Sequence, residues 1–435
     1  MDRVSTPRGS GPGTVRPGDI LELAVGEAVH GGWCVARTGP AGLVVFLRHA
    51  LPGERVRAVV TQVTASLARA DATVILEGSP DRVTPPCRHA RPGGCGGCDW
   101  QHASLDAQRR MKAGVIAQQL RRIAGIDRPV TVEPLPGDAD GLGWRTRVSF
   151  AVDATGRAGL RRHRSHEVIG VGSCPIAHPL VNEQAVTGLR WQATRSVDVT
   201  ASPGSGQAAV VVTGAAVRSE NLARIPAGSV LTAARDGRTR ARRGTGYLTR
   251  RAAGRDWRTG ASVFWQVHPG AADALADAVL AALDPQPGQA ALDLYCGAGL
   301  FAGVLAAAVG PSGRVIGIEA DPQAVRDARH NLRGTPWARV HRGDVATVLA
   351  RTGTGGAALA VLDPPRAGVR REVLDLLSEP DGTVRRICYV SCDPATLARD
   401  LAVLCRAGWR LDSVRGFDAF PMTHHVECVA AVTRG

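Results

Sequence analysis

Apolar and polar positions follow two different patterns along the 435-residue chain, and the change falls near residue 266. Beyond it, apolar runs at residues 290–295, 314–318 and 358–362 have the length of buried strands, and residues 271–283 have helical spacing. Strands that alternate with helices predict a doubly wound, mainly parallel sheet. We therefore expect an α/β domain over residues 266–435, with its site at the carboxyl ends of the strands.

Short β-prone runs dominate the beginning of the chain. They occur at residues 20–25, 42–47, 55–60 and 72–76, separated by turn residues such as Gly31-Gly32. Several short strands at this spacing predict a small closed β-barrel over residues 18–78. Residues 1–17 are rich in Ser, Pro, Gly and Arg, and we expect them to form a disordered tail.

The middle of the chain, residues 79–265, combines a helical stretch with a basic β-type pattern. Residues 105–126 have the spacing of an amphipathic helix, and the pattern does not decide whether it belongs to the middle or the C-terminal domain. Arginine alternates with apolar residues around 144–152, which predicts an antiparallel sheet with one basic face. Arg145, Arg147 and the cluster 161–164 are candidates for nucleic-acid backbone contacts, and a solvated sheet face is an equal alternative.

The charge balance indicates a partner. A formal net charge of +14 favours a polyanion, nucleic acid before anything else. Nearly all of this charge is arginine, which coding bias also produces, and Lys112 is the only lysine. No apolar run approaches the ~20 residues that span a bilayer, and the first residues lack the apolar core of a signal peptide. Ten cysteines in such a chain predict a reducing cytoplasm, where clustered cysteines serve metal binding or catalysis.

Three of the cysteines are clustered in a Gly-rich segment. Cys87, Cys95 and Cys98 have the spacing C-x7-C-x2-C, and Cys174 is a candidate fourth ligand. Small residues let the backbone wrap closely around a metal centre. Three or four thiolates suit either a structural zinc ion or a [4Fe–4S] cluster. The spacing alone favours zinc slightly, and a Cys-x2-Cys redox pair lacks the βαβ context that it needs.

A different cysteine lies in the stretch 388–400. A β-prone run ends at Ser391-Cys392, and Asp393-Pro394 then begins a helix. We expect the helix N-terminus to lower the pKa of the Cys392 thiol and to favour a nucleophilic thiolate. A buried structural cysteine is the alternative. We expect the cysteines in apolar surroundings to be packing residues: Cys34, Cys296, Cys388, Cys405 and Cys428.

A nucleoside-binding pattern follows the run 290–295. Gly297 and Gly299 form a Gly-x-Gly turn, and Glu319 ends the next apolar run, where its carboxylate can accept both ribose hydroxyls. Asp344 lies where an acid can accept the adenine amino group. Ala302 stands at the third glycine position of a dinucleotide-binding turn, where alanine is also accepted, so the departure from that pattern is only partial. Taken together, these features favour S-adenosyl-L-methionine over a dinucleotide.

These segments together resemble the class I S-adenosylmethionine-dependent RNA 5-methyluridine methyltransferases over nearly the whole chain. The resemblance depends on residues 362–368 (Leu-Asp-Pro-Pro-Arg-Ala-Gly), 389–400 (Tyr-Val-Ser-Cys-Asp-Pro-Ala-Thr-Leu-Ala-Arg-Asp) and 425–428 (His-Val-Glu-Cys). Residues 26–32 and 51–56 resemble the TRAM domain, an OB-like RNA-binding barrel. The likeness implies transfer or ribosomal RNA as the substrate. No obligate protein partner is evident from the sequence.

The resemblance also implies residue roles. Cys392 would be the nucleophile and Glu427 the general base, with Asp363 beside the uracil or the thiol. The cofactor would be surrounded by Gln266, Tyr295, Glu319 and Asp363. The four cysteines at 87, 95, 98 and 174 would hold a [4Fe–4S] cluster, which reverses the spacing-based preference for zinc. The chain departs from the family pattern in a longer first cysteine gap, in His268 for a common Asn and in Leu300 for a cofactor-contacting Asn.

Uracil chemistry accounts for these residue types. A thiolate that adds to C6 moves electron density onto C5, which can then attack a methyl sulfonium, and a base must afterwards remove the C5 proton. Pro365 occupies the position of the second cysteine of cytosine enzymes, which favours uracil. The alternatives are a methyltransferase for DNA or a small molecule, a non-catalytic RNA-binding protein and a zinc-containing version of the same enzyme.

Overall fold

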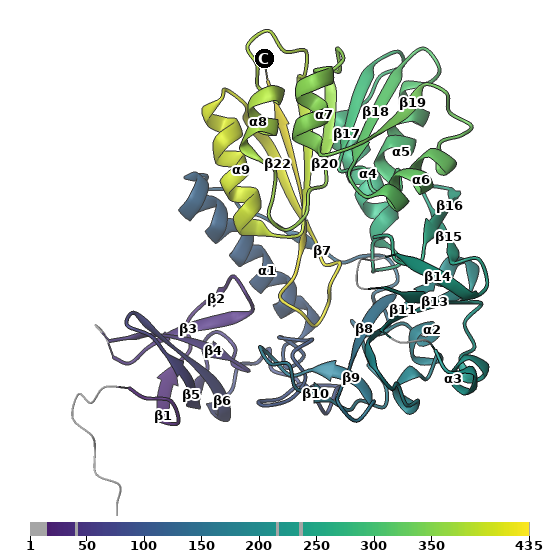
Figure 1. The fold of residues 1–435 in the computed structure, drawn as a ribbon. Coiled ribbons are helices and arrows are strands. Elements are labelled where there is room, and N and C mark those ends of the chain that lie inside the picture. Colours follow the sequence, from purple (N-terminus) through teal and green to yellow (C-terminus); the bar gives the residue numbers. More distant parts are fainter. Residues whose placement is uncertain (1–14, 40–41, 215–216, 235–237, 435) are drawn as a thin grey trace, which may run out of the picture. The chain divides into compact units, whose positions relative to one another are not determined.

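The computed structural model describes residues 15–39, 42–214, 217–234 and 238–434. Residues 1–14 of the expected disordered tail therefore lie outside the described residues. The chain forms two compact units, which divide between Val83 and Thr84 (Figure 1). Within the described ranges, no helix is both long enough and apolar enough to cross a membrane.

The first unit is a six-stranded sheet with the strand order β1-β5-β6-β4-β3-β2. Its core consists of alternate inward-facing residues, among which Val45, Leu47 and Val56 have no exposed surface. All four predicted strands are present, and the sequence did not reveal β2 and β3, which flank the Gly31-Gly32 turn. The strands are β1 (Ile20–Ala24), β2 (Ala28–Val29), β3 (Trp33–Arg37), β4 (Val44–Arg48), β5 (Arg55–Val63) and β6 (Leu67–Glu77).

The second unit begins with a seven-stranded sheet, here called the middle sheet, with the order β10-β9-β8-β11-β12-β13-β14. All its pairings are antiparallel except β12 with β13, so the predicted antiparallel sheet is largely confirmed. Its strands are β8 (Arg147–Val152), β9 (Ala158–Arg161), β10 (Val168–Ile169), β11 (Thr194–Ser202), β12 (Gln207–Gly214), β13 (Ser229–Ala233) and β14 (Thr239–Arg243). Beside them lie α2 (Pro179–Asn182), η2 (Val186–Gly188), η3 (Pro203–Ser205), α3 (Ser219–Arg224) and the hairpin β15 (Tyr247–Ala252) and β16 (Arg255–Gly260).

An eight-stranded sheet, here called the large sheet, follows with the order β19-β18-β17-β20-β21-β23-β22-β7. The pairings from β19 to β21 are parallel, whereas β23 runs antiparallel to both β21 and β22. This confirms the predicted doubly wound sheet. Its strands are β7 (Val132–Glu133), β17 (Ala290–Leu294), β18 (Arg314–Glu319), β19 (Ala338–Arg342), β20 (Leu359–Leu362), β21 (Arg386–Ser391), β22 (Arg410–Phe417) and β23 (Glu427–Thr433).

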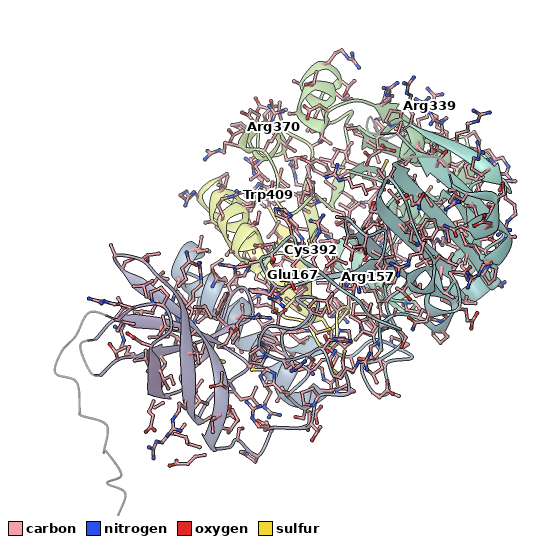
Figure 2. All side chains as sticks on the ribbon, turned by 60° about the horizontal axis from the view of Figure 1, so that its bottom comes forward. Arg157, Glu167, Arg339, Arg370, Cys392 and Trp409 are labelled. Atoms are coloured by element: carbon pink, nitrogen blue, oxygen red, sulfur yellow. The ribbon has the colours of Figure 1, made fainter. Side chains whose placement is uncertain are left out.

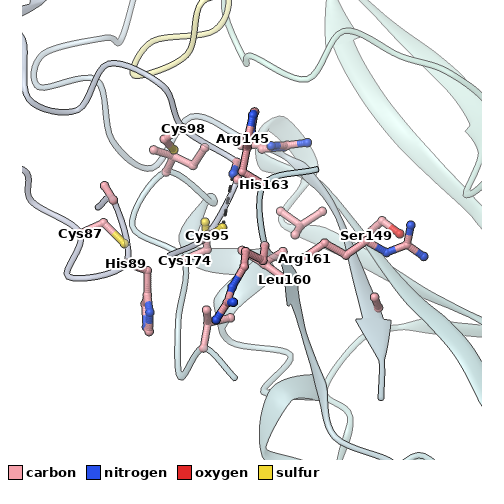
Figure 3. Close-up of a pocket in the computed structure, with 18 of the residues that line it drawn as sticks. Cys87, His89, Cys95, Cys98, Arg145, Ser149, Leu160, Arg161, His163 and Cys174 are labelled. Carbon is pink, nitrogen blue, oxygen red and sulfur yellow. Dashed lines mark hydrogen bonds between the residues drawn. The ribbon is translucent and has the colours of Figure 1, made fainter. Parts of the chain in front are cut away.

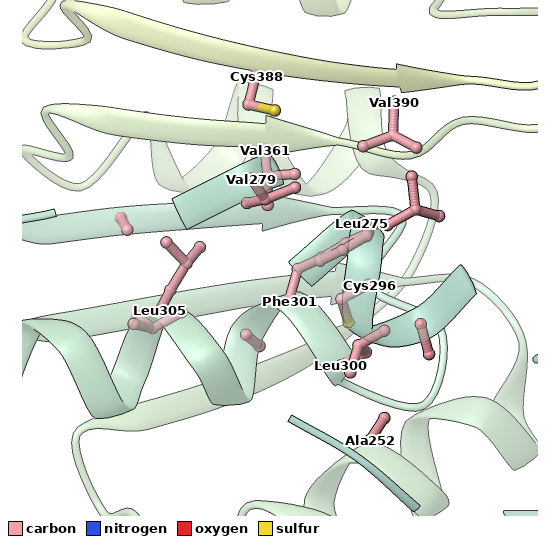
Figure 4. Packing of buried hydrophobic residues seen from close by; sticks show 14 of the residues in the cluster. Ala252, Leu275, Val279, Cys296, Leu300, Phe301, Leu305, Val361, Cys388 and Val390 are labelled. Atoms are coloured by element: carbon pink, nitrogen blue, oxygen red, sulfur yellow. The ribbon is translucent and has the colours of Figure 1, made fainter. Parts of the chain in front are cut away.

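Helices cover both faces of the large sheet (Figure 1). One face packs on α4 (Ala271–Leu283), α5 (Leu300–Val309) and α6 (Pro322–Asn331), and Figure 4 shows Leu275 and Phe301 of this layer near Val361 and Val390. The other face packs on α7 (Val345–Thr352), α8 (Arg371–Leu377) and α9 (Pro394–Arg406). Of the expected packing cysteines, Cys34, Cys296, Cys388 and Cys428 are buried, and Cys405 is half-buried.

A segment from before the middle sheet completes the large sheet. β7 pairs in parallel with β22, with Val132 opposite Gly416. Helix α1 (Leu105–Gln119) and the π-helical turn η1 (Leu120–Ala124) pack on α9, and Ile116 is buried in the core that α9 shares. The helix that the sequence could not assign therefore belongs with the large sheet.

Candidate functional site

Three predicted catalytic residues lie at the same edge of three adjacent strands. Asp363 follows β20, Cys392 follows β21, and Glu427 is the first residue of β23. Leu362 pairs with Tyr389, and Ser391 pairs with Cys428, so the register brings these ends together. Cys392, labelled in Figure 2, stands between the end of β21 at Ser391 and the start of α9 at Pro394. The edge is the carboxyl end of the parallel strands, where such folds place their ligands.

Helix α9 holds the backbone beside Cys392. Asp393 is its N-cap, and the Asp393 carboxylate accepts hydrogen bonds from the backbone N–H groups of Ala395 at 3.0 Å and Thr396 at 2.9 Å. Pro394 occupies the first turn, as the sequence indicated. The strand-to-helix switch is therefore confirmed, with Cys392 half-buried at its corner.

The pKa of the Cys392 thiol is raised to about 11, which contradicts the expected lowering. Burial is the main cause, the nearby Glu427 carboxylate adds to it, and Arg366 opposes both. The helix N-terminus does not outweigh desolvation and a neighbouring negative charge. In the free protein the thiol therefore keeps its proton at neutral pH.

The two carboxyl groups share this environment. Glu427 is 3% exposed, and burial together with the Asp363 charge raises its pKa well above the ordinary value. Burial and Glu319 raise the pKa of Asp363 to about 7. Titratable groups with pKa values moved this far are typical of catalytic sites.

Arg366 is a site residue that the sequence reasoning did not assign. It lies on the loop that follows β20, hydrogen-bonds to Cys392 and carries the positive charge that lowers the pKa of both Cys392 and Glu427. Its signal was the Asp-Pro-Pro-Arg run, in which the arginine stands three residues after Asp363.

The glycine turn after β17 is held by Glu319. The Glu319 carboxylate accepts from the N–H of Gly297 at 3.0 Å and from that of Asp321 at 2.7 Å. Tyr295 enters this turn with a φ of 67°, which is strained for a residue with a Cβ. Gly299 has a φ of 91°, and a Cβ there would lie 3.2 Å from that of Ala328 on α6. The turn thus packs closely on the helix that follows Glu319.

Two other predicted cofactor residues come from separate segments of the chain. Gln266 is buried, just before α4. Asp344 is the N-cap of α7, and its Oδ1 accepts from the N–H of Thr347 and from Arg370, which lowers the pKa of Asp344. The Asp344 carboxylate, predicted to contact adenine, thus also caps α7 and pairs with Arg370.

The four predicted metal-binding cysteines line one cavity of about 780 Å³ (Figure 3). Burial raises the pKa of three of the thiols, and each of the three also interacts electrostatically with at least one other member of the cluster: Cys95, Cys98 and Cys174. Within the described residues, no three His, Cys, Asp or Glu side chains come close enough together to hold a single metal ion. The cysteines are therefore brought to one cavity but not around one ion.

The predicted RNA-contacting arginines have different surroundings. Arg145 donates to the carbonyl of Arg147, and Arg147 donates to those of Ser262 and Val263, each at 3.1–3.3 Å. Arg161 is exposed beside the cysteine cavity. The basic sheet face is thus partly occupied by bonds within the protein.

The large sheet with its glycine turn defines a methyltransferase fold. The tRNA (uracil-54, C5)-methyltransferase of Pyrococcus abyssi, solved with S-adenosyl-L-homocysteine, has a TM-score of 0.73 over 95% of this chain and 100% of that chain, at 21% sequence identity. The family model described as tRNA (Uracil-5-)-methyltransferase matches residues 357–434, and the TRAM domain model matches residues 14–73.

Curated relatives extend the match to nearly the whole chain. An uncharacterized RNA methyltransferase of Streptomyces avermitilis is 48% identical over 427 residues, 95% of this chain and 98% of that protein. A second, from Streptomyces coelicolor, is also 48% identical and spans 95% of this chain and 92% of that protein. The chain belongs to this RNA methyltransferase family. The TRAM domain that the sequence resembled is confirmed.

Proposed function

We propose that the protein forms 5-methyluridine in transfer or ribosomal RNA in the cytoplasm, with S-adenosyl-L-methionine as methyl donor. The observation that carries this proposal is the convergence of Cys392, Glu427, Asp363 and Arg366 at one edge of the large sheet. This set provides a nucleophile, a buried base and a cation beside them both.

Cys392 begins the reaction. Its thiol loses a proton to solvent, and the Arg366 guanidinium stabilises the thiolate. The sulfur adds to uracil C6, and electron density moves through C5 toward O4. Asp363, whose pKa of about 7 leaves it partly protonated at neutral pH, can donate a hydrogen bond to the uracil edge where this charge develops.

Glu427 completes the reaction. Once C5 carries the new methyl group, its proton must leave before the C6–S bond can break. Glu427 in its ionised form takes the proton, the C5–C6 double bond forms again, and the Cys392 thiolate departs. Burial keeps the basicity of this carboxylate high, because a carboxylate in a poorly solvated site binds a proton more tightly.

The methyl donor would lie over the glycine turn. Tyr295, Gly297 and Gly299 would form the wall, Glu319 and Asp344 would offer carboxylates to the ribose and adenine, and Gln266 and Asp363 would lie beside the cofactor. RNA would be held in part by the TRAM domain, because OB-like barrels bind single-stranded nucleic acid.

We propose that the four cysteines of this cavity hold a [4Fe–4S] cluster rather than zinc. A zinc ion needs its four ligands within about 2.3 Å of one point. In a cluster each of the four thiolates binds a different iron, so their sulfurs stand further apart. Cys87, Cys95, Cys98 and Cys174 all line one cavity, which is what either kind of centre requires, and the family resemblance makes the cluster the expected one.

RNA that contains 5-fluorouridine tests the uracil chemistry. Fluorine at C5 cannot leave as a proton, so the Cys392 adduct should accumulate and shift the protein on a denaturing gel. We expect a band that depends on S-adenosyl-L-methionine, that persists in Cys405→Ala, the control on α9, and that disappears in Cys392→Ala. Separate transfer and ribosomal RNA pools would identify the substrate. A folded protein that binds the cofactor but gives no band would indicate another acceptor or a purely RNA-binding role.

Anaerobic purification tests the metal centre. We expect a brown protein with visible absorption and about four irons per chain, as ligation of a [4Fe–4S] cluster by four cysteine thiolates requires. Cys98→Ser should lose the absorption, whereas Cys34→Ser, in the other unit, should keep it. Stoichiometric zinc without colour would overturn the cluster.

A further inference from the structure

The loop that leads into Glu427 is bound at several points to elements from much earlier in the chain. It comprises residues 418–426, between β22 and β23, and is called the base loop. Gln108 of α1 accepts from the N–H of Met422 at 2.7 Å, and Lys112 donates to the carbonyl of Phe420 at 3.0 Å. Met422 has a φ of 67°, which a residue with a Cβ adopts only when its surroundings hold it there.

The residues that follow Cys98 form hydrogen bonds with the same loop. The N–H groups of Asp99 and Trp100 both donate to the carbonyl of Met422 at 3.1 Å. The Asp99 carboxylate lies 2.6 Å from Nδ1 of His424 and accepts from the His424 N–H at 3.3 Å. The Asp99 carboxylate therefore meets both the ring and the backbone N–H of His424.

These contacts continue toward the base. The His424 ring lies 4.0 Å from that of His425, and the His425 ring meets that of Phe420 edge to face. Val426 is buried, and Glu427 follows as the first residue of β23. His424, which contacts the Asp99 carboxylate, stands three positions before Glu427. The two residues between them are held as well, His425 by its ring contacts and Val426 by burial.

We propose that Asp99 is a positioning residue that holds the base loop, and through it Glu427, in the geometry needed to take the C5 proton. This rests on the proposed function. The segment that carries Cys87, Cys95 and Cys98 thereby gains a role in catalysis. Asp99 directly follows Cys98, so a change in the order of this segment would reach Glu427 through Asp99.

The proposal makes a specific kinetic prediction. Addition of Cys392 to C6 and methylation at C5 do not use Glu427. Loss of the C5 proton, which precedes elimination of Cys392 from C6, does use it. A misplaced base leaves the methylated adduct intact, because the C6–S bond cannot break until the C5–H bond gives up its proton. A displacement of about 1 Å at a reacting group costs on the order of 100-fold in rate.

The test uses ordinary uridine RNA and the full-length protein. Asp99→Ala should lower kcat by about 10- to 100-fold with little change in KM, and a covalent protein–RNA band should accumulate that the wild type lacks. Asp99→Asn retains an oxygen that can accept from Nδ1 of His424 and should largely restore turnover. Asp106→Ala, an exposed acid at the start of α1, is the matched control and should behave as wild type.

Two further readouts separate failure of the positioning role from failure of the proposed function. His424→Phe keeps a ring but removes Nδ1, so it should also accumulate the adduct and provides a second variant if Asp99→Ala does not fold. The visible absorption of the Asp99 variants should equal that of the wild type, since the cysteines are unchanged. If the wild type traps 5-fluorouridine RNA and Asp99→Ala turns over uridine RNA normally, the positioning role is overturned while the proposed function stands. If the wild type traps nothing, the proposed function itself fails.

Discussion

Nζ of Lys112 lies 2.5 Å from Oδ1 of Asp418, and neither side chain has any exposed surface. The pair joins α1 to the first residue of the base loop. Burial lowers the pKa of Lys112, and the Asp418 carboxylate opposes that shift. Apart from its histidines, the chain's other basic side chains are arginines, and its only lysine stands at a fully buried position.

Removing one member of this pair should destabilise the second unit strongly. Lys112→Met leaves the Asp418 carboxylate buried without its close cation, and the Arg109 guanidinium is 3.9 Å away. Breaking a buried ion pair in this way costs about 3–5 kcal/mol of unfolding free energy. Urea unfolding of Lys112→Met, Asp418→Leu and the double variant measures this. The double variant should lose much less than the sum of the single variants, and additive losses would contradict the coupling.

The loop that carries Arg366 should depend on Asp400. The buried Asp400 carboxylate accepts from the N–H of Val369 at 2.9 Å and from the Tyr389 hydroxyl at 2.7 Å. Tyr389→Phe removes one hydrogen bond to a charged group, which costs about 1.5–3 kcal/mol. We expect a loss of unfolding free energy in this range together with slower formation of the Cys392 adduct. An unchanged adduct rate would show that the loop is held by its other contacts.

The pH dependence of adduct formation should report the Cys392 thiol. Because its pKa is raised to about 11, the rate constant with 5-fluorouridine RNA should increase from pH 5 to pH 7 as the thiolate fraction grows, a range in which Asp363, with a pKa of about 7, still keeps the proton that it donates to the uracil. Arg366→Ala removes the charge that lowers this pKa, so its profile should move to higher pH and its rate at pH 7.5 should fall. Arg366→Lys should restore part of the rate. A flat profile in this range would contradict a protonated resting thiol.

Glu427→Gln should separate the two halves of the reaction. The variant can form and methylate the adduct but cannot take the C5 proton, so a covalent band should appear with ordinary uridine RNA. The folded-state pKa of Glu427 is raised above the unfolded value of 4.5, so its ionisation costs folding stability as the pH rises above that value. The variant should therefore gain more stability relative to wild type at pH 8 than at pH 5. Thermal unfolding at both pH values measures this difference.

The sequence predicted the regular part of the fold well because periodicity reports burial directly. The strands before Glu319, Asp363 and Cys392 appeared as short apolar runs, and each ends where the site begins. The N-cap role of Asp393 also followed from local chemistry, since the residues involved are neighbours in the chain.

Contacts between residues far apart in the chain could not be predicted from periodicity or local chemistry. The direction of the Cys392 pKa shift depends on Glu427, which reaches the site only through sheet pairing. The contact between Asp99 and His424 joins residues 325 positions apart, and no local sequence pattern predicts it. Two-residue β7 has too few residues to show any periodicity.

The pairing of β7 with β22 affects how the protein folds during synthesis. Glu133 binds Arg415, 282 residues later. At about 5–20 residues per second, the ribosome needs roughly 14–56 s to supply that partner. Throughout this interval the apolar side of α1 lacks the helix α9 on which it packs, so the nascent chain must shield Ile116 and Leu120 by other means. The large sheet can therefore be completed only when β22 has been synthesised, although its edge strand β7 precedes the middle sheet in the chain.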